Sequence, residues 1–457
     1  MKPLPISLRS VLALLVCVSP ALHAGEQTNV RALGMARTFV ASSRNLDAVG
    51  INPAGLYAPE DATVTFSLLP LGVNVGSDFL SYGMYNDLFT GVAGPGGRVA
   101  KDLTDADKQR LLDAFPSGLG RLGGEAEIRS FGLALHVGGL LTVSATVTDR
   151  VSADAQIPSS YARLLLYGMS PNSTSDLSGT RGAAAWMREY ALSGALPVPT
   201  FGLVEHLTAG LSLKLMHGYA YEELSRNNSL LTTGINGVLD GSVDLAGVQS
   251  VTPKFAPFPL PAGTGIGVDV GLTAQLNDYM SAGLSVTDMG SIDWNTGVKE
   301  FYGQGSIHLD DVLNSDQRDS LQHALTGRTR DGKAFSTALP TTLRMGLAFD
   351  LQHIPWVKKV LMGDLLVECD YNQGFNNFPG STTIGRFSVG TEYKPWGFIP
   401  LRTGVSFGGL DRFNFALGFG IHLGLFQLDV GSDNMGWLFS HDSFTHGSVG
   451  LSMMFRF

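Results

Sequence analysis

The stretch FNFALGFGIH, residues 413–422, decides the fold class. Phe413, Phe415, Leu417, Phe419 and Ile421 alternate with small or polar residues, so in an extended chain all five side chains point to one face. The final stretch, VGLSMMFRF at residues 449–457, repeats this alternation. A period of two predicts a β-strand with one apolar face and one small or polar face.

Twelve further segments carry the same pattern, so we predict about fourteen strands. The complete set comprises residues 62–68, 127–137, 140–148, 188–196, 207–216, 265–275, 279–287, 341–351, 363–371, 384–394, 399–408, 411–422, 425–432 and 447–457. Eleven extended residues span roughly 36 Å, and a tilt near 40° reduces this to about 27 Å, the height of a membrane-spanning strand. Strands of soluble proteins average only about 5–6 residues.

The composition excludes several other classes of protein. Only 16% of the 457 residues are charged, against roughly 25% in ordinary soluble domains. After residue 24 no apolar run reaches the about 18 residues that a transmembrane helix needs, which excludes a helical membrane protein. The net charge of −9 argues against a nucleic-acid-binding protein, which would carry a basic patch.

The connections between the predicted strands alternate in length. Residues 69–126, 149–187, 217–264 and 288–340 form long connections, whereas those at the opposite ends of the strands hold about 2 to 11 residues. If both termini are periplasmic, the long connections are extracellular, as is typical of outer-membrane barrels. We therefore predict an all-β fold, a transmembrane antiparallel β-barrel of about 14 strands, surrounded by lipid in the outer membrane of a Gram-negative-type bacterium.

We predict three parts along the chain. Residues 1–24 have the features of a signal peptide, in which Lys2 and Arg9 precede an apolar run at residues 11–18. Residues 25–60 lack alternation but carry apolar side chains that need a place to bury, and we predict that they plug the lumen against inward-facing glycines of the strands. Asn52 and Pro53 alone would indicate only a turn, and we favour a plug that ends in this turn. Residues 61–457 form the barrel.

The stretches RALGMARTFVA, residues 31–41, and NPAGL, residues 52–56, resemble the opening segment of outer-membrane long-chain fatty-acid transporters. Barrel subunits associated with type IX secretion, and uncharacterised relatives in the same superfamily, open similarly. The resemblance implies a fourteen-stranded barrel with an N-terminal plug. Within the resembling stretch we assign Asn52, Pro53 and Gly55 to the plug and its gating, with Asn52 and Pro53 fixing the turn into the first strand. The stretch SYGMYNDLFTG, residues 81–91, is more similar to the uncharacterised relatives, so the substrate stays open.

The function implied by this resemblance is the passage or binding of hydrophobic small molecules. The alternative is a non-transport barrel that acts as a binding or secretion-associated module through its extracellular loops. Two loop segments, residues 103–112 and 315–325, have the capping residues of short helices. Three roles stay open for these helices: covering the mouth of the barrel, binding a partner, or local packing.

Charged residues on the predicted lumen face of neighbouring strands form a second candidate site. They either hold the plug or form an ion-pair network that rigidifies the wall, and we favour the wall network. These residues are Arg344, Glu368, Asp370, Arg386, Glu392 and Arg402.

We predict neither an enzyme nor a metal or other cofactor. Ser440-His441-Asp442-Ser443 contains the residue types of a hydrolase triad, but a triad is usually assembled from distant positions, so we interpret it as a polar outer loop. The histidines lack the spacing of metal ligands, and Cys369, the one cysteine after residue 24, falls on the predicted lipid face.

Phe455 and Phe457 end the last predicted strand in the pattern that the barrel assembly machinery reads in this class of protein, so we expect this machinery as a partner. Deleting Phe457 should lower the amount of folded, heat-modifiable protein in outer-membrane fractions. The mobility shift of unheated samples on gels measures this amount. An unchanged folded yield would count against the barrel.

Overall fold

The computed structural model describes residues 27–58, 62–200, 202, 204–252, 259–310, 317, 327–409, 412–439 and 442–457. The predicted signal peptide, residues 1–24, lies outside the described residues. So do Ser440, His441 and, apart from Gln317, the helix predicted at residues 315–325. Within the described ranges, no helix combines the length and apolar character needed to cross a membrane.

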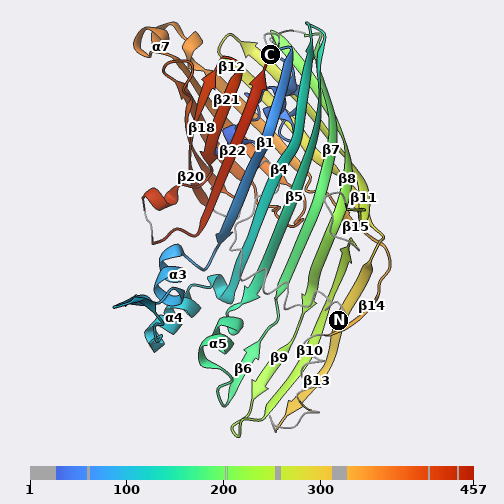
Figure 1. Ribbon diagram of the computed structural model, residues 1–457, viewed down its shortest axis with the longest axis vertical. Coiled ribbons are helices and arrows are strands. Elements are labelled where there is room, and N and C mark those ends of the chain that lie inside the picture. The colour runs from blue at the N-terminus through green and yellow to red at the C-terminus, as the bar shows by residue number, and fades with distance from the viewer. Residues whose placement is uncertain are drawn as a thin grey trace.

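Fourteen antiparallel strands close into a barrel (Figure 1). Pairing of the first strand with the last, with Phe66 opposite Phe455, completes the ring. The predicted fold class and strand number are confirmed, and each predicted segment overlaps one of these strands. In chain order they are β1 (Val64–Ser77), β4 (Leu119–Val137), β5 (Leu141–Pro158), β7 (Arg181–Val198), β8 (His206–Asn227), β11 (Gly263–Asn277), β12 (Met280–Trp294), β16 (Thr342–Asp350), β17 (Asp364–Gly374), β18 (Arg386–Lys394), β19 (Leu401–Gly408), β20 (Phe413–Leu423), β21 (Phe426–Ser432) and β22 (His446–Arg456).

The alternation in the sequence separates the two faces of this wall. On β20, Phe413 and Phe419 are 52% and 51% exposed on the outer face, while Asn414 and Ala416 are buried on the inner face. Successive side chains of a strand point to opposite sides, so a period of two puts the apolar set outside and the small or polar set inside. This arrangement is that of barrels with lipid outside and a polar lumen.

Several strands continue beyond the barrel at the end that carries the long connections, which we call the long-loop end. Along β8 the pairing partner changes from β11 to β10 (Leu239–Val251), so the sheet branches there. The branch is extended by β6 (Ser173–Asp176), β9 (Leu230–Thr233), β13 (Val298–Leu309) and β14 (Arg328–Asp331), while β15 (Phe335–Ala338) pairs with β12.

The description of the segments 217–264 and 288–340 as loops was therefore incomplete. Much of each segment is strand, and Leu231, Leu239 and Ile307 form a small apolar core with Tyr161 and Leu164 of α5 (Ser159–Tyr167). These strands pack against one another and against that helix. In β10, Leu239, Val243 and Leu245 alternate with polar residues, so the sequence carries a strand signal there that the prediction missed.

Helices are short, and the longest of them lie in the long connections. The helix expected at residues 103–112 is present as α4 (Asp105–Asp113), where Thr104 and Asp107 form a capping box. The hydrogen bonds from Thr104 hold the pKa of Asp107 below its usual value. Elsewhere in the described ranges the helices include α2 (Val30–Leu33), η1 (Asn45–Ala48), η2 (Pro53–Leu56), α3 (Tyr82–Phe89), η3 (Pro116–Gly118), η4 (Leu351–His353), α7 (Pro355–Val360) and η5 (Gly436–Leu438). The remaining strands, β2 (Val92–Gly94) and β3 (Gly97–Val99), pair as a hairpin that is separate from the barrel sheet.

Residues 27–58, which we call the N-terminal segment, lie inside the barrel (Figure 1, dark blue). Their side chains are almost completely buried, and Leu33, Phe39 and Leu46 have no exposed surface. Leu46 and Leu56 pack against Ala134 of β4, on the inner face of the wall. The segment contains only single turns of helix, so most of its backbone polar groups need partners from outside it.

Candidate functional site

The N-terminal segment lies directly against the backbone of the wall at several inward-facing glycines of the strands. A Cβ atom at Gly418 would lie 2.8 Å from Cα of Gly34, and one at Gly390 would lie 2.7 Å from the carbonyl oxygen of Met35. Real Cβ atoms essentially never approach so closely, so only glycine permits this contact. Glycines that meet the segment in this way include Gly210, Gly271, Gly346, Gly390, Gly404, Gly418 and Gly450.

Two carboxylates on β17 hold the middle of the segment. Asp370 accepts hydrogen bonds from the backbone N–H groups of Phe39 at 2.6 Å and Val40 at 3.0 Å. Glu368 accepts from those of Ala41 at 2.6 Å and Ser42 at 3.3 Å. Residues 39–42 belong to no helix or strand, so these carboxylates supply the partners that regular structure would otherwise provide. We call this arrangement the carboxylate clamp.

A second set of contacts fixes the start of the segment to β18, β19 and β21. Arg31 donates to both carboxylate oxygens of Glu392, at 2.8 and 2.6 Å. Arg402 donates to Glu392 and to Asp429, each at 2.6 Å. Among the predicted lumen residues, Glu392 therefore contacts both the N-terminal segment and the wall, and Arg402 belongs to the wall network.

Asn52 joins two parts of the segment to β11. Its side-chain nitrogen donates to the carbonyl oxygens of Val40 at 3.0 Å and Leu272 at 3.1 Å, and its side-chain oxygen accepts from the N–H of Ala54 at 3.2 Å. Pro53 begins η2, and Gly55 lies so close to Ser43 that a side chain there would overlap it. The three residues suggested by the resemblance therefore lie together, enclosed by the wall of the barrel.

The remaining two predicted lumen residues lie on the long-loop side of the segment. Arg344 and Arg386 line a small cavity of about 50 Å³ together with Arg37 of the N-terminal segment. Arg37 also forms an ion pair of 2.6 Å with Asp433, which gives the segment another anchor.

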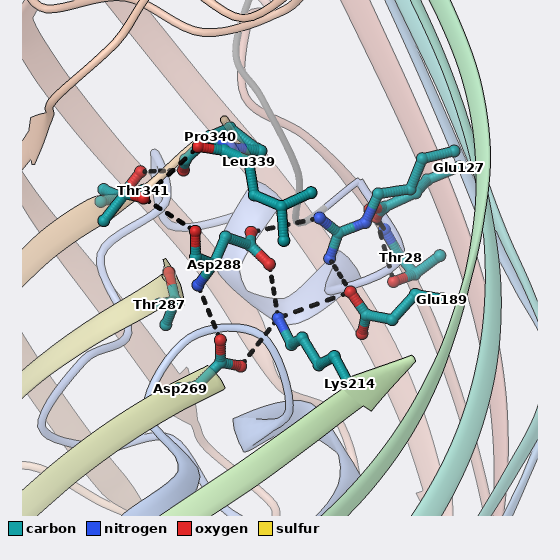
Figure 2. A network of polar contacts seen from close by, with 12 residues as sticks. Thr28, Glu127, Glu189, Lys214, Asp269, Thr287, Asp288, Leu339, Pro340 and Thr341 are labelled. Carbon is teal, nitrogen blue, oxygen red and sulfur yellow. Dashed lines mark hydrogen bonds and ion pairs between the residues drawn. The ribbon is translucent and has the colours of Figure 1, made fainter. Parts of the chain in front are cut away.

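A larger ion-pair network occupies the opposite half of the lumen (Figure 2). The ammonium group of Lys214 lies 2.6 Å from Asp288, 2.8 Å from Asp269 and 3.4 Å from Glu189. Arg150 lies 3.1 Å from Glu189 and 3.2 Å from Asp288. Figure 2 shows Glu189, Lys214, Asp269 and Asp288 converging on one place. The network joins residues that are distant in the sequence, since Arg150 and Asp288 are 138 positions apart.

Sequence reasoning missed much of this network. Glu127, Arg150, Glu189 and Asp288 lie at or just beyond the margins of the segments predicted as strands. Glu127 also accepts a 3.0 Å hydrogen bond from the backbone N–H of Thr28, so the network reaches the N-terminal segment. Opposite charges on the inner faces of consecutive strands could have indicated the ion-pair network. Pairing them requires the register between neighbouring strands, which the sequence does not show.

An aromatic cluster lies next to this network, toward the long-loop end. Tyr221 and Trp294 have ring centroids 5.4 Å apart, and Phe335 and Phe378 lie 5.6 and 6.4 Å from the Tyr221 ring. Trp294 is fully buried and donates a 2.9 Å hydrogen bond to Thr337. This aromatic cluster is an apolar region inside the barrel.

The short-loop end of the lumen is different in character. A cavity of about 360 Å³ there is lined by charged residues of both signs, among them Arg31, Asp47, Glu392 and Asp429. Among the residues that the structure describes, no group of three or more His, Cys, Asp or Glu side chains is placed to hold a metal. From the long-loop end inward, the lumen thus contains the aromatic cluster, the ion-pair network, the N-terminal segment and the polar cavity.

The closed fourteen-stranded barrel is the fold of outer-membrane channels for hydrophobic compounds. Residues 57–433 match a family described as a family of unknown function, DUF5723, and the chain belongs to this family. No curated protein sequence matches it.

Solved structures with this fold include a TodX deltaS2S3 mutant, described as a monoaromatic hydrocarbon channel. It has 13% identity and a TM-score of 0.51, with 96% of this chain and 99% of that chain covered. The toluene transporter TodX of P. putida has 13% identity and a TM-score of 0.49, with 93% of this chain and 97% of that chain covered. A FadL homologue of Pseudomonas aeruginosa has 12% identity and a TM-score of 0.46, with 96% of this chain and 100% of that chain covered. These likenesses concern the fold.

The glycine contacts generate a stability prediction. Gly418→Val should destabilise the folded barrel by about 1–3 kcal/mol, because the new side chain would overlap Gly34. Gly305→Val is the matched control, because no atom lies within 4 Å of the position where its Cβ would be added. The temperature at which unheated samples lose their gel mobility shift measures both variants. Equal temperatures for the two variants would contradict the close contact.

Proposed function

We propose that the N-terminal segment, as part of a plug formed by residues 25–60, closes a barrel formed by residues 61–457. Residues 1–24 are proposed to be a signal peptide that directs the chain to the outer membrane of a Gram-negative-type bacterium. In this proposal the long-loop end is extracellular and the barrel assembly machinery recognises Phe455 and Phe457. The glycine contacts, the carboxylate clamp and the Arg31–Glu392 pair support the plug, since each joins the segment to the wall.

The proposed function is the binding and passage of hydrophobic small molecules from the long-loop end. The observation that carries this proposal is the aromatic cluster of Tyr221, Trp294, Phe335 and Phe378 inside the lumen. Barrel interiors are usually polar, so an apolar cluster at this place suits an apolar ligand. The TodX mutant with the same fold is described as a monoaromatic hydrocarbon channel, which is consistent with such a ligand. The TodX mutant is described as a channel, and we propose no catalytic role.

Passage beyond the aromatic cluster would require the plug to move. Lys214 and its carboxylate partners are buried next to the cluster, and breaking a buried ion pair is strongly unfavourable. An apolar molecule offers these charges no replacement partner. We propose that Asn52, Pro53 and Gly55 act as the gating part of the plug, because Asn52 ties it to β11.

A second candidate function is that of a binding or secretion-associated module without transport. The branched sheet of β6, β9, β10, β13 and β14, with α5 packed on it, favours this alternative. Such a structured projection at the long-loop end offers a surface for a protein or a surface component.

An uptake experiment tests transport. Liposomes that contain the wild type should take up members of a hydrophobic panel, including toluene, faster than empty liposomes. Trp294→Leu should slow this uptake several-fold because it removes a fully buried ring of the aromatic cluster. Deleting residues 27–50 should admit small polar solutes and abolish selectivity.

Trp396→Leu is the matched control, because Trp396 is 60% exposed in a connection at the short-loop end. It should leave uptake unchanged, and gel mobility before heating should show that all variants are folded. If the wild type accelerates the uptake of no member of the panel, transport is wrong and the binding module becomes the better proposal.

A further inference from the structure

A small unit beside the barrel exposes an unusual amount of apolar surface. It consists of Ser81 as the N-cap, α3 and the β2–β3 hairpin, residues 81–99, and we call it the side platform. Figure 1 shows α3 to one side of the barrel, next to the long-loop end of β1. The side platform is separate from the lumen contacts on which the proposed transport depends.

The helix α3 is apolar on two adjacent faces. Met84 and Leu88 are buried against Leu111 of α4 and neighbouring apolar residues. Tyr85 and Phe89, on the other face, are 48% and 47% exposed, and their rings stack with centroids 6.1 Å apart. The first face explains how α3 packs within the protein, whereas the second face remains at the surface.

The hairpin also exposes apolar side chains. Val92 and Val99 are opposite each other in the β2–β3 pairing and are 44% and 49% exposed. A two-stranded hairpin is only marginally stable in water unless its apolar side packs against something. Helix and hairpin together therefore present apolar side chains that stay half-exposed within the described part of the chain.

The side platform is joined to the lipid-facing surface of the barrel. The N–H of Tyr82 donates a 2.7 Å hydrogen bond to the carbonyl oxygen of Phe444, in the connection between β21 and β22. The same connection carries Phe439, which is 74% exposed and packs edge-to-face, at 5.0 Å, on Phe415 of β20. Aromatic side chains thus continue from the barrel wall toward the platform, at the level where barrels carry an aromatic girdle.

The charge next to this surface indicates which kind of lipid it fits. Arg98 donates to the carbonyl oxygens of Thr90 at 2.8 Å and Gly91 at 3.1 Å, and to the side-chain oxygen of Asn86 at 3.2 Å. These three partners are neutral, so their hydrogen bonds orient the guanidinium group without cancelling its positive charge. Phosphate headgroups of the outer leaflet carry the complementary charge.

We propose that the side platform is a membrane-surface anchor that inserts Tyr85, Phe89, Val92 and Val99 into the outer leaflet and binds anionic lipid headgroups through Arg98. Tyrosine and other aromatic side chains favour this interface, and partly buried amphipathic elements bind there through apolar area plus attraction to anionic lipid. The anchor rests on the membrane placement given under Proposed function, and it does not depend on transport.

Spin labels measure the position of the platform directly. In a Cys369→Ser background, labels are attached after Phe89→Cys, Val99→Cys, Phe419→Cys or Asp105→Cys, and the protein is placed in vesicles of phosphatidylcholine and phosphatidylglycerol. Phe419 lies on the outer face of the barrel, and the side chain of Asp105 is 89% exposed on α4. Labels at 89 and 99 should collide more often with lipid-soluble oxygen than with an aqueous nickel chelate, as the label at 419 should, while the label at 105 should show the reverse.

Arg98→Glu should lower the ratio of oxygen to nickel collisions at position 89 several-fold in these anionic vesicles, with no change at position 419. Labels at 89 and 99 that behave like the label at 105 would overturn the anchor while the barrel placement stands. Labels at 89 and 99 that both reagents fail to reach would overturn it in favour of a contact between protein copies. If the label at 419 also prefers nickel, the membrane placement itself is wrong.

Discussion

The structure depends on one constraint: a chain segment with little regular secondary structure is enclosed in a barrel, so its backbone N–H groups need partners from the wall. An unpaired buried backbone group costs about as much as a lost hydrogen bond. Glu368 and Asp370 meet this demand for residues 39–42, and Glu127 meets it for Thr28. Two features of the wall meet this need for hydrogen-bond partners. Carboxylates inside the barrel supply the acceptors, and glycines along the strands let the N-terminal segment come close enough to donate to them.

The order of the aromatic cluster, the ion-pair network and the N-terminal segment along the lumen connects this constraint to the proposed passage of hydrophobic molecules. An apolar molecule at the aromatic cluster would meet paired, buried charges before it reached the N-terminal segment. The energetic barrier to passage therefore lies in separating ion pairs and hydrogen bonds rather than in apolar contacts. In the proposed channel, polar solutes would be excluded until the segment moves.

The strands of the barrel were predictable because each of them has a period of two that can be read locally, as in Phe413 to Ile421. The helix at Asp105 was predictable for a similar reason, since Thr104 and Asp107 form a local cap. The strands of the branch were not predicted, although Leu239, Val243 and Leu245 of β10 alternate with polar residues. The apolar side chains of β9 and β10 pack against α5. The lumen contacts show a further limit. Glu368, Asp370 and Glu392 could be assigned to the inner face from alternation, but their partners depend on the path of the N-terminal segment, which no local pattern encodes. Glu392 pairs with Arg31, which is 361 positions away in the chain.

The most direct test of the account is hydrogen exchange at the backbone amides of residues 39–42 in the folded protein. Because these amides donate to Glu368 and Asp370, they should exchange slowly in the wild type and at least about tenfold faster in the double variant Glu368→Ala, Asp370→Ala. Asp269→Ala is the control, because Asp269 is equally buried but contacts Lys214 and Asp288 instead of the segment. Rapid exchange of these amides in the wild type, at the rate of exposed loops, would contradict the claim that the carboxylate clamp holds the segment.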